Sequence, residues 1–256
     1  MDGTLLHSDH SLNPEFFTIF QKLKEVGIRF VAASGRQYAS LKGVFEPVQD
    51  DIYFVAENGG YVSFQNQKIL VQRLDRDLIE KAVSVCRTLE NTFPVLCGTD
   101  IAYIEDDSFS ERIFPFYPKQ KLVENLLDVK DEIVKIAVYN PEDAEKNAYP
   151  YLKKNMEGNY LVKISGAFWV DVSTKTSNKG FALKQLQKNL HISENETMAF
   201  GDYLNDTEMM QAAHFSYAMS NAHPALKKLA RFEAKSNDED GVLEILKEVI
   251  CCKTED

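Results

Sequence analysis

The sequence has few cysteines and no long apolar run. Its four cysteines form no Cys-x-x-Cys pair and its five histidines form no metal-binding pattern, so we expect structural thiols in a reducing cytoplasm. No stretch approaches the roughly 18 to 20 apolar residues of a membrane span, and no basic segment followed by an apolar one marks a signal peptide. These absences argue against zinc-binding, disulfide-rich and membrane proteins, and they predict a cytoplasmic location.

Positive charge is also scarce. The 256 residues include 29 Lys and Arg against 39 Asp and Glu, a net charge of −10, which argues against a broad nucleic-acid surface. An anionic substrate would need local positive charge or a metal to bind. The 44% hydrophobic content is that of an ordinary globular protein, and the length suits one large domain or two modest ones. We expect a monomer or a weak homodimer.

Strand-length and helix-length segments alternate at both ends of the chain. Strands are expected at 28–33, 52–56, 197–200 and 215–219, and a hairpin at 61–64 and 69–72. Helices are expected at about 14–26, 36–45, 179–189, 205–213, 224–230 and 241–249. Such alternation on short connections predicts a parallel, doubly wound sheet.

The middle of the chain has a different pattern. It reads as helices at 78–89, 110–117 and 141–154 and strands at 93–97, 102–105, 133–139, 160–164 and 168–172. The predicted fold class is therefore α/β, with a doubly wound, Rossmann-like parallel-sheet core formed by residues 1–74 and 177–256. An α+β domain of residues 75–176 is inserted into it. The 253–256 tail is expected to be disordered.

The pattern Gly-Asp-x-x-Asn-Asp at 201–206 is the most informative internal motif. It follows an apolar strand and opens a helix, so its polar side chains lie where open α/β sheets bind ligands. The oxygens of Asp202, Asn205 and Asp206 suit Mg²⁺. The motif alone also fits a polar strand-to-helix turn with Asn205 or Asp206 as the helix cap.

Two further segments fit an anion site. Ser34, Gly35 and Arg36 end a strand and open a helix, which is a cradle for phosphate but also an ordinary capped turn. Arg36 could contact phosphate or face solvent. Lys179 lies at the start of a helix, where a cation interacts unfavourably with the helix dipole. Its position therefore suggests a phosphate-binding role, and the alternative is an ordinary surface lysine.

The chain opens Met1-Asp2-Gly3-Thr4-Leu5-Leu6. Together with the Ser-Gly-Arg, Lys179 and Gly-Asp-x-x-Asn-Asp segments, in that order, this start resembles the four motifs of haloacid dehalogenase-like phosphatases. The insertion, with Glu-Asn-Gly at 57–59 and Met-Ser-Asn-Ala at 219–222, is similar to the Cof-type subfamily and its bacterial sugar phosphatases. The resemblance covers essentially the whole chain.

The resemblance implies a Mg²⁺-dependent phosphatase that acts through an aspartyl-phosphate on small phosphorylated metabolites, with sugar phosphates first. Asp2 would be the general acid and base, and its backbone carbonyl would bind the metal. Asp202 would bind Mg²⁺ directly, while Asn205 and Asp206 would position metal waters and the phosphoryl group. Ser34, the backbone at Gly35, Arg36 and Lys179 would bind phosphate. The inserted domain would be a cap that sets substrate specificity.

The family's nucleophile is an Asp that would lie one residue before Met1, at the end of a strand. We expect a mis-set start or omitted residues, and a protein that begins at Met1 should be inactive and poorly stable. A non-catalytic phospholigand or metal-binding protein is then the alternative, and a receiver-like signalling domain is a third candidate that the insertion disfavours. Neither nucleic acid nor a membrane is expected as a partner.

Sequence does not name the substrate. The residues that could line a leaving-group pocket in the cap are Cys97, Gly98, Thr99, Phe168 and Trp169. For the aromatic pair, packing inside the cap is the favoured role.

Overall fold

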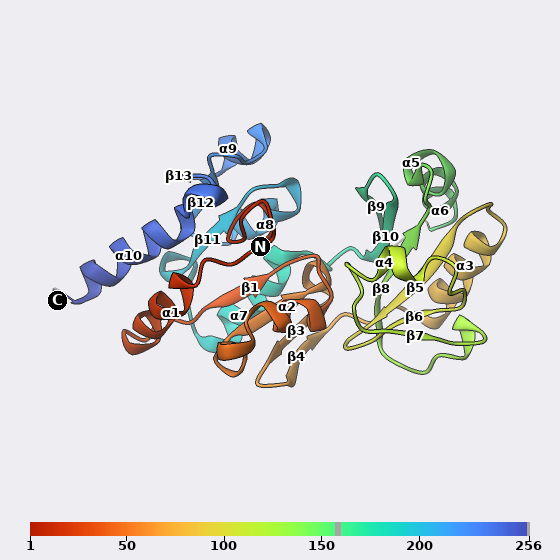
Figure 1. Cartoon of the computed structure of the whole chain (residues 1–256), viewed down its shortest axis with the longest axis horizontal. Coiled ribbons are helices and arrows are strands. Elements are labelled where there is room, and N and C mark those ends of the chain that lie inside the picture. The colour runs from red at the N-terminus through yellow and green to blue at the C-terminus, as the bar shows by residue number, and fades with distance from the viewer. Residues whose placement is uncertain (157–159, 255–256) are drawn as a thin grey trace.

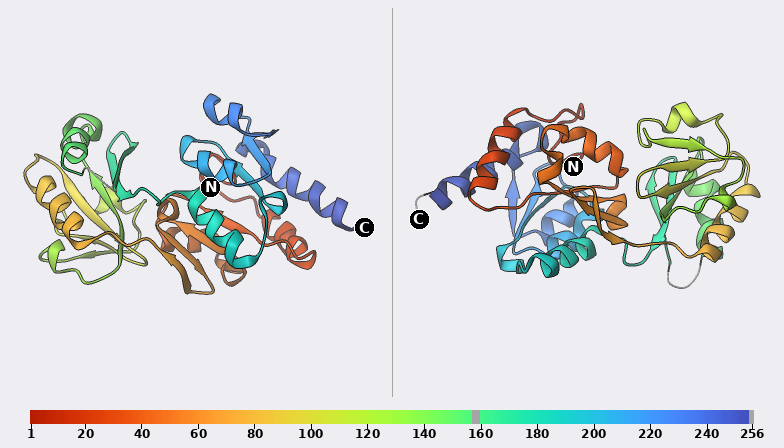
Figure 2. Two further views of the ribbon diagram at one scale, coloured as in Figure 1. Left: turned by 180° about the vertical axis from the view of Figure 1, so that it is seen from behind. Right: turned by 90° about the horizontal axis from the view of Figure 1, so that it is seen from below.

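The chain folds into two parts that are joined by two crossings (Figures 1 and 2). The computed structural model describes residues 1–156 and 160–254. The first part, or core, holds both ends of the chain and two sheets, and the second part, or cap, holds a third sheet. The mixed α/β class agrees with the sequence.

The core is built from both ends of the chain. Its strands are β1 (Val31–Ala33), β2 (Tyr53–Ala56), β3 (Tyr61–Phe64), β4 (Gln67–Val71), β11 (Met198–Gly201), β12 (Phe215–Met219) and β13 (Phe232–Ala234). Its helices are α1 (Glu15–Glu25), α2 (Tyr38–Val44), α7 (Lys179–Leu190), α8 (Thr207–Gln211), α9 (Pro224–Leu229) and α10 (Gly241–Thr254). The 3₁₀ turns η2 (Glu57–Gly59), η5 (Leu204–Asp206) and η6 (Asn237–Glu239) connect some of them.

The cap lies between β4 and α7 in the chain. Its strands are β5 (Phe93–Gly98), β6 (Ala102–Ile104), β7 (Gln120–Leu122), β8 (Ile133–Tyr139), β9 (Tyr160–Gly166) and β10 (Trp169–Thr174), in the sheet order β7-β6-β5-β8-β10-β9. Its helices are α3 (Arg76–Arg87), α4 (Ser110–Ile113), α5 (Ala144–Asn147) and α6 (Tyr149–Asn155). Apolar side chains from α3, β5 and β8 form a hydrophobic cluster of the cap's own.

Alternating side chains of β2 pack on opposite faces of the core sheet. Phe54 belongs to the cluster that also contains Phe16 of α1. Val55 points the other way, into a cluster with Leu186 of α7. Strands buried on both faces carry continuous apolar runs, which is why the 52–56 segment is apolar throughout. Helices therefore cover both faces, as a doubly wound fold requires.

The core strands form two separate sheets. One has the order β1-β2-β3-β4, with β1 and β2 parallel, and the other is the parallel set β11-β12-β13. In the described residues no strand pairing joins β1 to β11. Nevertheless Ala32 of β1 and Ala199 of β11 share one hydrophobic cluster, against which Met1 packs. The first residues of the chain therefore lie where the two sheets meet.

Several predicted boundaries are wrong. The predicted 141–154 helix is two helices, α5 and α6, because Pro150 lacks the backbone N–H that a helix interior needs and so stands near the start of α6. The predicted 205–213 helix begins as η5, and the 110–117 helix ends at Ile113. Strands β7 and β13 were not predicted. Helix α10 reaches Thr254, so the expected disorder of the tail is wrong up to that residue, and 255–256 lie outside the described residues.

Gly180 allows α7 to approach α8 closely. A Cβ on Gly180 would lie 2.3 Å from the backbone carbonyl carbon and oxygen of Glu208. Gly180→Ala should therefore lower the free energy of unfolding by about 1–3 kcal/mol, the usual cost of overpacking. Gly43→Ala is the matched control. Among the described residues, and leaving aside the backbone of α2 itself, no atom lies within 4 Å of the position that a Cβ on Gly43 would take. Urea denaturation that ranks the two variants equally would contradict this prediction.

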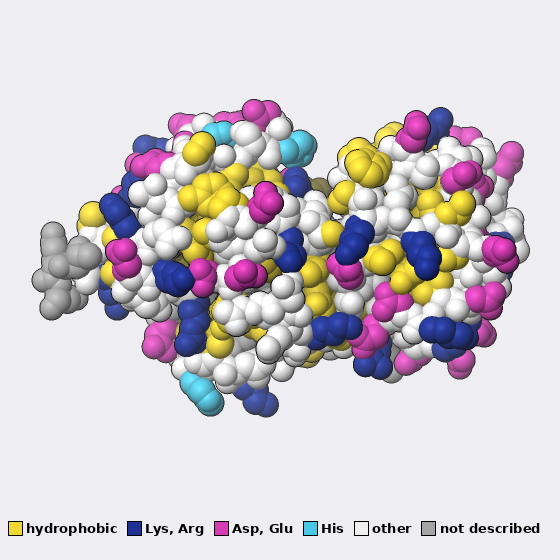
Figure 3. Space-filling model, turned by 60° about the horizontal axis from the view of Figure 1, so that its bottom comes forward, with side chains coloured by type: hydrophobic (Ala, Val, Ile, Leu, Met, Phe, Trp, Pro, Cys, Tyr) yellow, Lys and Arg dark blue, Asp and Glu magenta, His cyan; other side chains and the backbone are white. Residues whose placement is uncertain are grey.

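Charges of both signs are interspersed on the surface that Figure 3 shows. Within the described residues, no helix is both long enough and apolar enough to cross a bilayer.

Candidate functional site

The predicted site residues come together at one edge of the core. Ser34 follows β1, Asn58 follows β2 and Asp202 follows β11. Because these strands run in the same direction within their sheets, their carboxyl ends lie on the side where α/β sheets bind ligands. Asp2 is held at this edge as well, through contacts with the segment that follows β1.

The Asp2 carboxylate is bound by Arg36. Arg36 Nε donates to Asp2 Oδ2 at 2.8 Å and its Nη2 contacts Oδ1, while His10 Nδ1 lies 3.1 Å from Oδ1. Burial works to raise the pKa of Asp2, but the Arg36 hydrogen bonds and charge hold it below its usual value. The sequence left two alternatives open for Arg36, contact with phosphate and exposure to solvent. In this structure its guanidinium instead binds the Asp2 carboxylate.

The first turn of the chain is packed against Asp202. The Thr4 hydroxyl donates to Asp202 Oδ1 at 2.6 Å. A Cβ on Gly3 would lie 2.5 Å from Asp202 Oδ2, and Gly3 has a φ of +65°, so only glycine fits this turn without strain. Asn221, from the segment after β12, donates to the Gly3 carbonyl at 2.8 Å. The Asp-Gly-Thr segment and Asp202 are therefore fixed relative to each other.

Asp202 carries an unfavourable charge in this setting. Burial raises its pKa, and the nearby Asp206 carboxylate raises it further, while the Thr4 hydrogen bond lowers it. Oδ1 accepts from Thr4, and among the described residues Oδ2 accepts no hydrogen bond. A carboxylate of this kind favours a cation beside it.

Lys179 and Asp206 form a buried ion pair. Lys179 Nζ donates to Asp206 Oδ1 at 2.7 Å, and both side chains are almost inaccessible. Asp206 Oδ2 also accepts from the backbone N–H of Asp202, at 3.1 Å. Burial alone would raise the pKa of Asp206, but the Lys179 charge holds it below its usual value. The two residues predicted to bind phosphate and metal are thus bound to each other.

The backbone nitrogen of Met1 lies among these charges. Burial and the Lys179 charge lower the pKa of its amino group, while Asp206, Asp202 and Asp2 raise it.

Asn58 completes the site and was not singled out from the sequence. Its backbone N–H donates to the Ser34 carbonyl at 3.0 Å, and its side-chain oxygen accepts from Asn205 Nδ2 at 3.2 Å. A Cβ on Gly35 would lie 3.0 Å from Asn58 Oδ1. Asn58 has a φ of 54°, a conformation that Asn tolerates better than most residues, and this Asn-Gly pair was the available signal.

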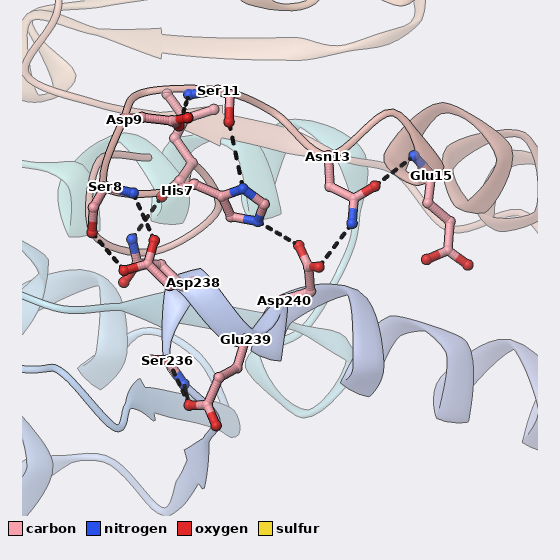
Figure 4. A network of polar contacts seen from close by, with 12 residues as sticks. His7, Ser8, Asp9, Ser11, Asn13, Glu15, Ser236, Asp238, Glu239 and Asp240 are labelled. Carbon is pink, nitrogen blue, oxygen red and sulfur yellow. Dashed lines mark hydrogen bonds and ion pairs between the residues drawn. The ribbon is translucent and has the colours of Figure 1, made fainter.

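The loop after the first turn is held by the segment that precedes α10. Figure 4 shows His7, Ser8 and Asn13 pointing toward the turn that leads into this helix. His7 Nε2 lies 2.8 Å from Asp240 Oδ1, Asn13 donates to Asp240 Oδ2 at 2.8 Å, and the Ser8 hydroxyl donates to Asp238 at 2.6 Å. These contacts hold the loop that follows the first turn against the segment that precedes α10.

The donor set fits a hard cation such as Mg²⁺. Within the described residues, no three His, Cys, Asp or Glu side chains cluster as a metal site. Asp202 with a backbone carbonyl and waters is nevertheless the kind of sparse oxygen set that Mg²⁺ accepts. The Asp206 and Asn205 side chains are engaged by Lys179 and Asn58 respectively.

The cap residues proposed for a leaving-group pocket are not equivalent. Cys97 and Thr99 are buried, and Phe168 is 45% exposed. Trp169 packs with its ring centroid 5.0 Å from that of Tyr139 and 5.7 Å from that of Tyr117, the packing role favoured from the sequence.

Comparison with known proteins gives consistent matches over nearly the whole chain. Residues 1–246 match the family model of haloacid dehalogenase-like hydrolases. The chain is 32% identical to the 5-amino-6-(5-phospho-D-ribitylamino)uracil phosphatase YbjI of Escherichia coli, covering 98% of this chain and 94% of the relative. It is 25% identical to phosphatase YwpJ of Bacillus subtilis, covering 98% of each. The crystal structure of SMU.1108c from Streptococcus mutans superposes with a TM-score of 0.86 at 30% identity, covering 98% of this chain and 97% of that one.

Proposed function

This chain belongs to the haloacid dehalogenase-like hydrolase family and is a phosphatase, and from that premise we propose that it is a Mg²⁺-dependent phosphomonoesterase. The observation that carries the proposal is the set of hydrogen bonds that joins the Asp-Gly-Thr segment through Thr4 to Asp202, Asp202 to Asp206, and Asp206 to Lys179. Small phosphorylated metabolites, sugar phosphates first, are the proposed substrates, and the cytoplasm is the proposed location.

Asp202 and the backbone carbonyl of Asp2 are the proposed Mg²⁺ ligands, with Asn205 and Asp206 positioning the metal's waters. Mg²⁺, when bound, neutralises charge on the phosphoryl oxygens. Lys179 would supply the second positive charge, and Ser34 with the backbone at Gly35 would donate hydrogen bonds to the same oxygens. Preorganised donors of this kind are a large contribution to catalysis.

Asp2 is the proposed general acid and base. Arg36 orients its carboxylate and keeps it ionised in the free protein, ready to accept the proton of the attacking water in the second half-reaction. In the first half-reaction the same group would have to donate a proton to the leaving alkoxide. Approach of the anionic phosphate would draw Arg36 away from Asp2, which removes the interaction that lowers the pKa of the acid.

The proposed nucleophile is a carboxylate joined directly to Met1. Comparing the chain with a form that carries any in-frame residues encoded before Met1, here called the extended form, tests this placement. Equal phosphatase activity of the two forms would show that another residue is the nucleophile.

The substrate class is tested by a panel of phosphate esters with the extended form. The relative from Escherichia coli is named for a small ribitylamino-uracil phosphate, and an acidic surface disfavours polyanions. We expect sugar phosphates and alditol phosphates to be hydrolysed with higher kcat/KM than phosphopeptides or nucleic acids. Hydrolysis of phosphopeptides alone would contradict the proposal, and binding of phosphate esters without turnover would favour a non-catalytic phospholigand protein.

A further inference from the structure

Gln72 joins three segments of the chain. It directly follows β4, at the start of the first crossing from the core to the cap. Its side-chain amide donates to the Gly59 carbonyl at 2.8 Å, in the turn after β2. The same amide donates to the Thr176 carbonyl at 2.9 Å, on the second crossing, between β10 and α7. One side chain thus ties both crossings to the turn after β2.

The hydrogen-bonding capacity of the Gln72 carboxamide is filled. The two carbonyls take its N–H groups, and its oxygen accepts from the hydroxyls of Thr174, at 3.3 Å, and Thr176. A carboxamide offers two donors and an oxygen with two lone pairs, so all four positions are occupied. The side chain is 8% exposed, and a buried carbonyl that loses its donor is costly. An apolar side chain of the same size could not replace these contacts.

The turn after β2 is also packed closely against the start of α7. Gly59 has a φ of +94°, and a Cβ on it would lie 2.4 Å from the Asn178 carbonyl oxygen. Asn178 caps α7, because its side-chain oxygen accepts from the Phe181 backbone N–H at 2.8 Å. Its own backbone N–H donates to the Thr176 carbonyl at 2.8 Å, the carbonyl that Gln72 also binds. The position of Thr176 therefore helps to set where α7 begins.

Two of these segments carry residues of the candidate site. Lys179 is the first residue of α7, so the contacts at the start of this helix place its side chain. Asn58 directly precedes Gly59, and its side-chain oxygen accepts from Asn205 Nδ2. The Gln72 hydrogen bonds therefore restrain both Lys179 and Asn58 through their neighbours in the chain.

We propose that Gln72 is a positioning residue, whose carboxamide holds Lys179 and Asn58 in the geometry that phosphoryl transfer requires. This inference rests on the proposed phosphatase function. A displacement of about 1 Å in a preorganised site can lower the rate roughly 10²-fold. A residue that only stabilised the fold would lower the melting temperature and leave the chemical step of the folded protein unaltered. The two roles therefore differ in what a substitution does to kcat.

The test compares Gln72→Met with Gln187→Met in the extended form. Gln187 of α7 is the matched control, because its side-chain amide also donates twice, to the Thr197 hydroxyl and the Ala212 carbonyl, each at 2.8 Å. Thr197 precedes β11 whereas Asp202 follows it, so the control lies at the opposite end of that strand from the site. The kcat and KM for phenyl phosphate are measured at a temperature at which melting shows each variant to be folded.

We expect Gln72→Met to lower kcat about 10- to 100-fold and to change KM less than about 3-fold, because the lost interactions act in the transition state. Gln187→Met should lower kcat less than about 3-fold, even where its melting temperature falls as far. If Gln72→Met does not fold, Gln72→Asn replaces it, since its carboxamide is one methylene too short to reach both carbonyls. Equal losses of kcat in the variants at the two glutamines, or a lower melting temperature at Gln72 without a loss of kcat, would overturn the inference.

Hydrogen–deuterium exchange separates failure of the inference from failure of the proposed function. Amides of residues 57–60 and 176–181 should exchange faster in Gln72→Met than in the parent, and they should keep the parent's rates in Gln187→Met. If the parent hydrolyses no phosphate ester, the proposed function fails, and exchange alone decides whether Gln72 restrains the two segments. Unchanged exchange in Gln72→Met would overturn the inference in either case.

Discussion

Asp202→Asn should abolish Mg²⁺-dependent turnover by the extended form while leaving the fold intact. The amide oxygen can still accept the Thr4 hydrogen bond, which is 2.6 Å long in the parent, so the local geometry should persist. The amide lacks the negative charge that a hard cation requires. Phosphate release is measured at saturating Mg²⁺, and activity of the variant near that of the parent would remove Asp202 from the metal site.

The same variant has a second expected result in thermal melting. Without metal, the raised pKa of Asp202 means that its ionised form is disfavoured in the folded state, so its contribution to stability decreases as the pH rises above the ordinary pKa. Asp202→Asn removes the carboxylate whose ionised form is disfavoured in the folded state. At neutral pH in EDTA, the Tm of the variant should therefore be no lower than that of the parent. Mg²⁺ at 100 times its Kd should stabilise the parent by about 2.7 kcal/mol and the variant by nothing. A loss of stability in EDTA would indicate a structural role for the charge.

Lys179→Met should lower kcat of the extended form about 10²-fold or more. Removing one preorganised group that stabilises transition-state charge commonly costs roughly 2.7–4 kcal/mol. Stability should fall as well, because Asp206 is left buried and unpaired, and breaking a buried pair costs about 3–5 kcal/mol. Activity must therefore be measured at a temperature at which melting shows the variant to be folded.

The double variant Lys179→Met with Asp206→Asn separates the two roles. It removes the unpaired buried charge, so most of the lost stability should return. If Lys179 also neutralises phosphoryl oxygens, turnover should stay low when stability returns. Recovery of stability and activity together would show that Lys179 acts only through its ion pair with Asp206.

Much of the site was predictable because each motif follows an apolar strand and precedes a helix. Ser34 and Asp202 could be placed at the ends of parallel strands from sequence alone, and the family resemblance is confirmed by the match over residues 1–246. The pairing of Asp2 with Arg36 and of Glu57 with Lys135 was not predictable. Such contacts join segments about 30 to 80 residues apart, and local periodicity carries no information about them.

The fold was predicted where strands are long or buried and missed where they are short. Strand β8, with seven buried residues, was predicted to the residue. Strands β7 and β13 have three residues each and lie at sheet edges, so they are too short to show a convincing alternation of apolar and polar residues. The separation of β1 from β11 also lies beyond sequence patterns, because pairing order is a tertiary property. The assignment of residues 75–176 as the substrate-selecting cap stays a prediction.

Release of inorganic phosphate from phenyl phosphate by the extended form is the most direct test of the phosphomonoesterase site. The measurement is made with Mg²⁺ and with EDTA, on the parent and on Asp2→Asn. We predict release that requires Mg²⁺, ceases in EDTA, and falls about 10²-fold or more in Asp2→Asn, within the range that general acid–base catalysis contributes. Release that is unchanged by EDTA, or undiminished in Asp2→Asn, would contradict the account.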